Sequence, residues 1–243
     1  MKSQNNSNPY LAKELHAFAK EKIGVEVLFA KEKENANRII LEDYSLWKEY
    51  ILNSEKPLFT AFRLAVAGNI IDYGAHSAPK DIKTKIEQLL KQPLALDNSG
   101  QLIESISKAK KILYLGDNAG EIVFDKMLIE TMNHPNVCYA TRGEAVINDV
   151  TFFDTKSVDL HSVCKVISNG NNAPSTILEI CNQEFLNEFN SADLIISKGQ
   201  GNFEGLLHEK GRNIFFLLMA KCAPIAKLLQ VKKGDQLIVN RSV

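Results

Sequence analysis

The sequence has only four cysteines in 243 residues, and no two of them are closely spaced. Cys138, Cys164, Cys181 and Cys222 form no Cys-x-x-Cys motif, which argues against a zinc knuckle and against a redox dithiol. An isolated free cysteine usually behaves as a small apolar residue of the protein interior. We therefore expect each of the four to be a small buried apolar residue.

The chain also lacks an excess of either charge. Lys plus Arg and Asp plus Glu number 29 each, so no field of one sign favours nucleic acid or an anionic membrane as a partner. No apolar run is long enough to span a bilayer, and residues 1–9 are polar where a signal peptide would have an apolar core. These absences predict a cytoplasmic protein that binds neither nucleic acid nor membranes.

The first hundred residues carry apolar side chains at helical spacing. The chain is 45% hydrophobic, so it can bury a substantial core. Helices are predicted over residues 10–23, 33–53, 56–71 and 81–90, where β-branched runs are few. The stretch 92–100, with Pro93 and Gly100, is the expected junction to the rest of the chain. We therefore predict a helical array over residues 1–100.

After about residue 110, short apolar runs alternate with helical patterns. Strands are predicted over residues 112–115, 137–140, 163–167, 194–197, 214–219 and 237–239. Such alternation is typical of βαβ units and of a mostly parallel sheet. We therefore predict an α/β domain over residues 101–243, built as a three-layer α/β/α fold with a mostly parallel sheet and preceded by the N-terminal helical array.

Polar side chains follow successive predicted strands at the point where each strand ends. They are Asp117 and Asn118, Arg142, Asn169, Lys198 and Lys221. Right-handed crossovers place these strand ends on one edge of the sheet, so the side chains can converge although they are far apart in sequence. Loops are generally polar, and the alternative is therefore a chance placement of unrelated loop residues.

The segment GDNAGE at residues 116–121 joins the first predicted strand to a helix-like run. Ligands of open α/β sheets bind at the carboxyl ends of strands, and Asp117 and Asn118 supply the hard oxygens that a divalent cation prefers. The alternative is a turn in which one of them only caps the next helix. Asn148 and Asp149 have the same two interpretations, although their apolar neighbours make an idle carboxylate there less expected.

The segment SKGQGNFE at residues 197–204 has the features of a phosphate cradle. Two glycines let the backbone approach an oxyanion closely, and Lys198 offers a positive charge. The segment lacks the Gly-Lys-Ser/Thr ending of a P-loop, so binding of a nucleoside triphosphate is not supported. The alternative is a glycine-rich turn with a solvated lysine.

A dinucleotide or S-adenosylmethionine site is the main competing interpretation of the first glycine-containing turn. Such sites have an acidic residue about 20 positions later, which takes the ribose hydroxyls. This sequence has Thr141 and Arg142 there, and an arginine suits a phosphate better than a diol. Asp117 would also repel a diphosphate, so the sequence argues against this competitor.

Five segments of the sequence resemble blocks of one known family. They are AGNIIDYG at 67–74, GDNAGE at 116–121, Arg142-Gly143 with NDVT at 148–151, SKGQGNFE at 197–204, and Lys221-Cys222. In this order, from about Asn8 to Val239, they resemble the metal-dependent damage-control phosphatase family, in its compact prokaryotic branch. Members of that branch usually begin with a further helical segment bearing Cys-x-x-Cys, and they have glycine where this sequence has Ser175. The resemblance therefore predicts either a short form of the fold or an incomplete chain.

The resemblance implies a phosphatase that acts on small phosphorylated metabolites, such as sugar phosphates, nucleotides or related damaged metabolites. It implies a divalent metal ion held by Asp117, Asn118 and Asp149, and catalytic roles for Asp117 and Lys198. The residues implied to meet the substrate or its phosphate are Asn69, Asp72, Arg142, Asn148, Asn169, Lys198, Asn202 and Glu204.

Elementary phosphate chemistry agrees with this resemblance. Hydrolysis of a phosphate monoester needs acceleration by up to about 10²¹-fold. A bound cation polarises the phosphoryl oxygens and lowers the pKa of a coordinated water. Two carboxylates and one amide oxygen form an open shell for Mg²⁺ or Mn²⁺, with Co²⁺ and Ni²⁺ as further candidate ions. No histidine lies in these segments, which disfavours a zinc hydrolase or a histidine phosphatase.

Several points remain open on the sequence alone. An S-adenosylmethionine-dependent methyltransferase and a non-catalytic phosphometabolite-binding module are the alternative functions. Either water or Asp117 could attack phosphorus.

Overall fold

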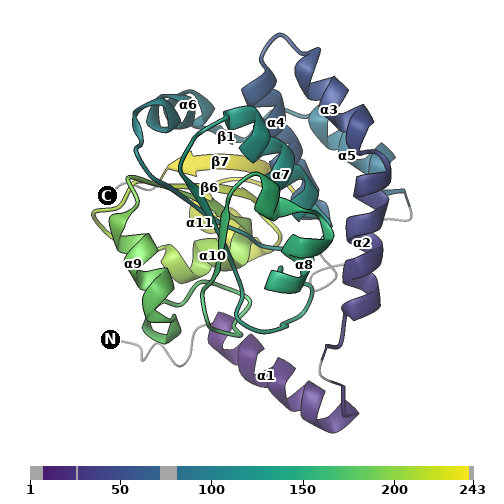
Figure 1. Cartoon of the computed structure of the whole chain (residues 1–243), viewed down its shortest axis with the longest axis vertical. Coiled ribbons are helices and arrows are strands. Elements are labelled where there is room, and N and C mark those ends of the chain that lie inside the picture. Colours follow the sequence, from purple (N-terminus) through teal and green to yellow (C-terminus); the bar gives the residue numbers. More distant parts are fainter. Residues whose placement is uncertain (1–7, 26, 72–80, 241–243) are drawn as a thin grey trace.

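The computed structural model describes residues 8–25, 27–71 and 81–240 of the chain. Within these residues the centre of the molecule is a seven-stranded sheet (Figure 1). Its strands are β1 (Leu96–Asp97), β2 (Ile112–Leu115), β3 (Val137–Thr141), β4 (Lys165–Ser168), β5 (Leu194–Lys198), β6 (Ile214–Met219) and β7 (Gln236–Asn240). The order across the sheet is β1-β7-β6-β5-β2-β3-β4.

The sheet is mostly parallel, as the sequence predicts. Strands β2 to β6 all pair in parallel, whereas β7 runs antiparallel to β6 and parallel to β1. The chain passes from β2 outward to β3 and β4 and then returns to β5 on the other side of β2. This reversal creates a switch point at the carboxyl ends of β2 and β5, where ligands bind in open α/β sheets.

Helices cover both faces of the sheet. The helices are α1 (Asn8–Ile23), α2 (Ala30–Glu42), α3 (Tyr44–Leu52), α4 (Pro57–Ala67), α5 (Ile82–Leu90), α6 (Ser99–Lys108), α7 (Glu121–Met132), α8 (Phe152–Ser157), α9 (Gln183–Ser191), α10 (Gly199–Leu206) and α11 (Ala223–Leu229), with the 3₁₀ turns η2 (Gly68–Ile70), η3 (Leu160–Ser162) and η4 (Leu178–Ile180). Tyr114 of β2 lies in one buried core with Phe62 of α4 and Phe124 of α7. Leu113, on the opposite face, lies in a second core with residues of α9, α10 and α11. The predicted three-layer α/β/α fold is therefore confirmed.

The helical half differs from its prediction in two respects. The helix expected over residues 56–71 ends as α4 at Ala67 and is followed by the 3₁₀ turn η2. The single helix expected over residues 33–53 is two helices, because the backbone of Asp43 leaves helical dihedral angles between α2 and α3. Aspartate competes with the helical backbone for hydrogen bonds and favours helix ends. The change of direction turns Trp47 of α3 onto Phe124 of α7, with ring centroids 5.8 Å apart.

The stretch expected to be a junction contributes to the sheet. Leu96 and Asp97 form β1 and pair with Leu237 and Ile238 of β7. Two residues are too few to show the alternation that identifies a strand in sequence. The boundary at residue 100 stays a prediction, although α4 shares its buried core with the sheet.

Two expectations about surface and interior can also be compared with the structure. Cys138 is buried, whereas Cys164, Cys181 and Cys222 are only partly buried, and all four are free thiols. In the part of the chain that the structure describes, no helix has both the length and the apolar character needed to cross a membrane.

Candidate active site

Two loops that follow β2 and β3 lie side by side at the carboxyl edge of the sheet. The amide of Val150 donates to the carbonyl oxygen of Asp117 (2.7 Å), and the amide of Ala119 donates to the carbonyl oxygen of Asn148 (2.9 Å). An isolated antiparallel bridge pairs Asn118 with Asp149. The backbone therefore holds together the three residues that the sequence proposes as metal ligands.

Arg142 joins the two carboxylates of this edge. Its Nε lies 2.7 Å from Asp149 Oδ2, and its Nη2 lies 3.7 Å from Asp117 Oδ1. The side chain is 2% exposed, and Nη2 has no hydrogen-bond acceptor. Buried polar groups almost always have a partner, so a buried guanidinium nitrogen without an acceptor is suited to receive one from a ligand.

Asn69 reaches the same edge from the helical half. It lies in η2, directly after α4, and is fully buried. Its Nδ2 donates to Asp117 Oδ2 (3.0 Å) and to Glu121 Oε2 (2.8 Å), while its Oδ1 accepts from the amide of Met219 (3.3 Å). Asn69 therefore fixes the direction of two carboxylates, and its own orientation is fixed by β6.

The carboxylates at this edge of the sheet are only partly neutralised by the neighbouring cationic side chains. Burial, followed by the charges of Glu121 and Asp149, raises the pKa of Asp117 well above its ordinary value. Lys221 and Arg142 act in the opposite direction without cancelling these effects. Removing a carboxylate from water and placing it beside like charges disfavours its ionised form. A cation bound to Asp117 would favour its ionised form and lower its pKa again.

Lys198 lies beneath this edge rather than at its surface. It is the last residue of β5, it is fully buried, and its Nζ lies 2.7 Å from Asp125 Oδ1 and 3.2 Å from Glu121 Oε1. Burial alone would lower the pKa of Lys198, but the charges of Asp125 and Glu121 outweigh it and raise that pKa. The lysine is therefore a charged group held between two carboxylates of α7.

The partner of Lys198, Asp125, is the centre of a buried polar cluster. Asp125 also accepts from the hydroxyl groups of Tyr114 (2.7 Å) and Tyr139 (3.0 Å), whose rings stack with centroids 5.3 Å apart. Sequence reasoning missed Glu121 and Asp125 as partners. The available signal was their spacing of four residues with only the apolar Ile122, Val123 and Phe124 between them, because buried acids need a cation or donors.

The turn after β5 brings the glycine-rich segment against Asp117. Gly199 has φ of 78°, and a Cβ atom placed on it would lie 1.8 Å from Asp117 Oδ2. Only glycine fits both that backbone angle and that approach. Asn202, also buried, donates to the carbonyl oxygens of Gly116 (3.0 Å) and Lys198 (2.8 Å), and it thereby ties the end of β2 to the end of β5.

The other predicted site residues are placed less centrally. Asn169 caps its own loop, because its Oδ1 accepts from the amide of Asn171 (3.1 Å). Glu204 accepts from Gln200 (2.8 Å) and lines a separate cavity of about 180 Å³ beside α1. Among the described contacts, none joins Glu204 to Asp117 or Asp149. Asp72 lies outside the described residues.

The structure also shows the surroundings of Ser175, the position at which family members usually have glycine. Ser175 is fully buried, and its hydroxyl donates to the carbonyl oxygen of Gly201 (2.8 Å). The serine side chain therefore packs against the glycine-rich segment at this point.

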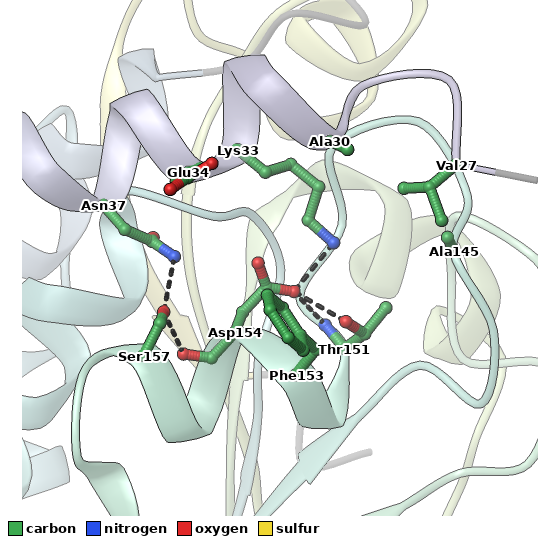
Figure 2. Close-up of a pocket in the computed structure, with 10 residues that line it drawn as sticks. All are labelled: Val27, Ala30, Lys33, Glu34, Asn37, Ala145, Thr151, Phe153, Asp154 and Ser157. Carbon is green, nitrogen blue, oxygen red and sulfur yellow. Dashed lines mark hydrogen bonds and ion pairs between the residues drawn. The ribbon is translucent and has the colours of Figure 1, made fainter.

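Helix α2 contacts α8 next to a cavity of about 380 Å³, as Figure 2 shows, and it also contacts the residue that follows the Asp117 loop. Lys33 Nζ lies 2.7 Å from Asp154 Oδ2, and both side chains are buried. Asn37 donates to Ser157 Oγ (3.2 Å) and accepts from the amide of Gly120 (2.6 Å). Because Gly120 follows the Asp117 loop and Asp154 follows the Asp149 loop, α2 fixes the two loops relative to each other.

The residues of this edge suit a hard divalent cation. Within residues 8–25, 27–71 and 81–240, no three His, Cys, Asp or Glu side chains are grouped to hold a metal, so amide or carbonyl oxygens and water would have to take part. The Oδ1 atom of Asn148 is buried and accepts no hydrogen bond, beside Asp149. An oxygen without a donor and a carboxylate with a raised pKa are both satisfied by Mg²⁺ or Mn²⁺.

Comparison with known proteins identifies relatives over nearly the whole chain. The profile of the damage-control phosphatase ARMT1-like domain matches residues 1–237. An uncharacterized protein of Methanocaldococcus jannaschii is 38% identical over 219 residues, which cover 86% of this chain and 72% of the relative. A damage-control phosphatase of Pyrococcus horikoshii is 42% identical over 177 residues, 72% of this chain and 62% of the relative. A damage-control phosphatase of Archaeoglobus fulgidus is 32% identical over 238 residues, 94% of this chain and 81% of the relative.

A solved structure has the same fold. The crystal structure of a DUF89 family protein from Pyrococcus horikoshii superposes with a TM-score of 0.85 and 34% sequence identity. The superposition covers 94% of this chain and 80% of that chain.

Proposed function

Because the chain belongs to the damage-control phosphatase ARMT1-like family, we propose that it is a phosphatase that hydrolyses phosphate monoesters of small metabolites with a divalent metal ion. Two of the relatives described above carry the name damage-control phosphatase. This membership favours phosphate hydrolysis over the methyltransferase that the first turn alone leaves open. The candidate substrates are sugar phosphates, nucleotides and related damaged metabolites.

The observation that carries the proposal is the buried guanidinium of Arg142. Its Nη2 has no hydrogen-bond acceptor and faces Asp117, while its Nε is held by Asp149. An arginine fixed in this way offers a directed donor to a phosphoryl oxygen, and it costs no rearrangement when the charge of the transferring group develops. Arg142 is therefore proposed to bind the substrate phosphate.

Asp117, Asn118 and Asp149 are proposed to hold the metal ion, with Mn²⁺, Mg²⁺, Co²⁺ or Ni²⁺ as candidates. When bound, such an ion supplies charge stabilisation for the phosphoryl group and an acidic coordinated water. The raised pKa of Asp117 and the partnerless Oδ1 of Asn148 support this assignment. Asn69 serves the site by donating to Asp117 and thereby fixing which of its oxygens faces the ligand.

For Lys198 we propose a positioning role in place of the direct phosphate contact that the sequence predicts. Its ammonium group is fully buried and already paired with Glu121 and Asp125. It neutralises part of the acidic cluster beneath Asp117, and Asn202 fixes the backbone turn that follows it. Because Lys198 offsets the charge of Glu121 and Asp125, these two carboxylates can be buried next to the proposed metal site.

The test is phosphate release from an aryl phosphate and from a panel of sugar phosphates and nucleotides, with each of the four metals and with EDTA. The parent should need metal, and Asp117→Asn should abolish turnover. Because that change removes a carboxylate whose pKa is raised by burial and like charges, the metal-free variant should melt no lower than the parent. Glu87→Gln, an exposed site, is the control.

Two results would overturn the proposal. One is a parent protein that releases no phosphate from any compound of the panel with any of the four metals. The other is an Asp117→Asn variant with the parental kcat/KM at saturating metal.

A further inference from the structure

The loop that carries Asp149 contains an unusual backbone conformation. Ile147 has φ of 45°, in the left-handed region. The other non-glycine residues with positive φ in the described chain are Asn133, Asp159 and Gln230. Asparagine and aspartate tolerate this region, whereas a β-branched residue there is a genuine outlier that the surrounding structure must enforce. The conformation of Ile147 therefore needs a cause.

Backbone hydrogen bonds tie the turn around Ile147 to the site edge. The carbonyl oxygen of Val146 accepts from the amide of Asp149 (3.0 Å), which makes residues 146–149 a tight turn. The carbonyl oxygen of Asn148 accepts from the amide of Ala119 (2.9 Å), which ties the turn to the Asp117 loop. The angle at Ile147 thus decides where Asn148 and Asp149 lie relative to Asp117.

A further backbone group of the turn, the amide of Ile147, is held by a distant helix. The amide of Ile147 donates to Nε2 of His16 at 3.0 Å, across 131 positions of sequence. His16 lies on α1, which Figure 1 shows along one edge of the molecule, apart from the sheet. A ring nitrogen that accepts a hydrogen bond carries no proton, so the imidazole is neutral with its proton on Nδ1.

Part of the apolar surface of α1 is exposed to solvent. Three of its apolar side chains, Leu11, Leu15 and Phe18, are 50%, 70% and 59% exposed. These three side chains contribute little to the docking of α1, and the hydrogen bond from Ile147 to His16 is a specific polar contact that joins the helix to the Asp149 loop. Burial, with a smaller contribution from Lys20, lowers the pKa of His16, which agrees with a neutral ring.

We propose that His16 is a positioning residue of the active site. Its neutral imidazole holds Ile147 in the left-handed conformation and thereby places Asn148 and Asp149 against the Asp117 loop. The inference rests on the proposed function, because His16 matters to the site only if Asp149 binds the proposed metal ion. It adds α1 to the elements that build the site.

The experiment compares four variants of the full chain with the parent. His16→Ala removes the acceptor, and His16→Gln restores one, since the Gln Oε1 reaches about as far as Nε2. In the double variant His16→Ala with Ile147→Gly, glycine adopts positive φ without the side-chain penalty, so the turn no longer needs the anchor. Leu15→Ala is the control on the same helix, because Leu15 is 70% exposed.

Two measurements are made on each variant. The first is hydrogen exchange of the Ile147 amide in metal-free protein, which needs no activity. The second is calorimetric binding of Mn²⁺. Loss of one hydrogen bond to a strained turn should weaken Mn²⁺ binding about tenfold in His16→Ala. The Ile147 amide should exchange faster in the same variant, while His16→Gln and the double variant recover Mn²⁺ binding and Leu15→Ala matches the parent.

The inference is overturned if His16→Ala exchanges the Ile147 amide and binds Mn²⁺ as the parent does. It is also overturned if Leu15→Ala weakens Mn²⁺ binding equally, or if neither His16→Gln nor the double variant recovers it, because the effect would then come from undocking of α1. A parent that binds Mn²⁺ but releases no phosphate would instead overturn the proposed function, so the two failures are distinguishable.

Discussion

Replacing Lys198 by methionine tests the charge balance beneath the active site. The ammonium group is fully buried between Asp125 Oδ1 (2.7 Å) and Glu121 Oε1 (3.2 Å), and methionine keeps an unbranched side chain that is one heavy atom shorter and carries no charge. The change leaves two buried carboxylates without their cation. Removing one partner of a buried ion pair costs about 3–5 kcal/mol, because the remaining charge is desolvated and uncompensated.

This cost should appear as a lower melting temperature. For a chain of this size a change of 1 kcal/mol shifts the melting temperature by about 2–4 °C, so Lys198→Met should melt about 6–20 °C below the parent. The difference in melting temperature between Lys198→Met and the parent should become smaller as the pH falls from 8 to 5. Burial already raises the pKa of Asp125, and losing Lys198 raises it further. A carboxyl whose pKa is higher in the folded than in the unfolded state gains protons on folding, so stability rises as the pH falls through that window.

The assay is thermal unfolding followed by circular dichroism across this pH range, together with kcat/KM for phosphate release. Adding Asp125→Asn to Lys198→Met should recover most of the melting temperature, because the amide oxygen can accept from one of the two tyrosine hydroxyls that bind Asp125 while the amide NH2 donates to the other. The control Lys108→Met removes an exposed lysine and should change little. A Lys198→Met protein that melts within about 2 °C of the parent would refute the reasoning.

Activity in the double variant separates the two roles considered for Lys198. If the lysine only positions the acidic cluster, the double variant should regain kcat/KM along with stability. If the lysine touches the substrate phosphate, kcat/KM should stay about 10²- to 10³-fold low despite restored stability, as expected for a lost donor to the transferring group. The latter result would reinstate the direct contact that the sequence predicts.

Two further predictions concern the glycine-rich turn and the thiols. Gly199→Ala should lower stability and abolish metal-dependent turnover, since its Cβ would lie 1.8 Å from Asp117 Oδ2, whereas Gly211→Ala, with φ of 71° and no atom within 4 Å, should show only the backbone penalty of about 1–2 kcal/mol. Equal melting temperatures for the two variants would contradict the clash. Burial raises the pKa of Cys138 and of Cys164 to about 12 from 9.0, so native protein at pH 8 should be alkylated at these thiols about 10³-fold more slowly than urea-unfolded protein. Alkylation of either at the unfolded rate would show that the thiol is accessible and ionised.

The sequence predicted the fold class because its signals are local. Alternating apolar runs and helical patterns identify βαβ units without any knowledge of what packs where. The same topology explains why Asp117 and Arg142 were expected together, since parallel strands deliver their carboxyl ends to one edge, whereas Asp149 was added by the family resemblance. The structure joins these three by ion pairs and backbone hydrogen bonds, and their roles in metal and phosphate binding stay predictions.

The surroundings of Lys198 could not be predicted in the same way. Side chains of a strand alternate between faces, so Lys198 points to the same side as Leu194 and Ile196, which lie in the core beneath α7. The contacts of Lys198 with Glu121 and Asp125 can be predicted only if the packing of α7 on that face of the sheet is known. Local sequence shows only a lysine at a strand end before two glycines, a pattern that a phosphate cradle and a buried ion pair share.

The division of the chain at residue 100 follows composition, but the site crosses it. Asn37 accepts from Gly120, Asn69 donates to Asp117, and His16 accepts from Ile147, so residues of the first hundred contact both loops of the proposed metal edge. Each of these contacts is buried or partly buried, where losing one partner leaves an unsatisfied group. The helical half is therefore part of the framework of the proposed active site, and an α/β fragment beginning near residue 108 would lack the groups that contact Asp117 and the Asp149 turn.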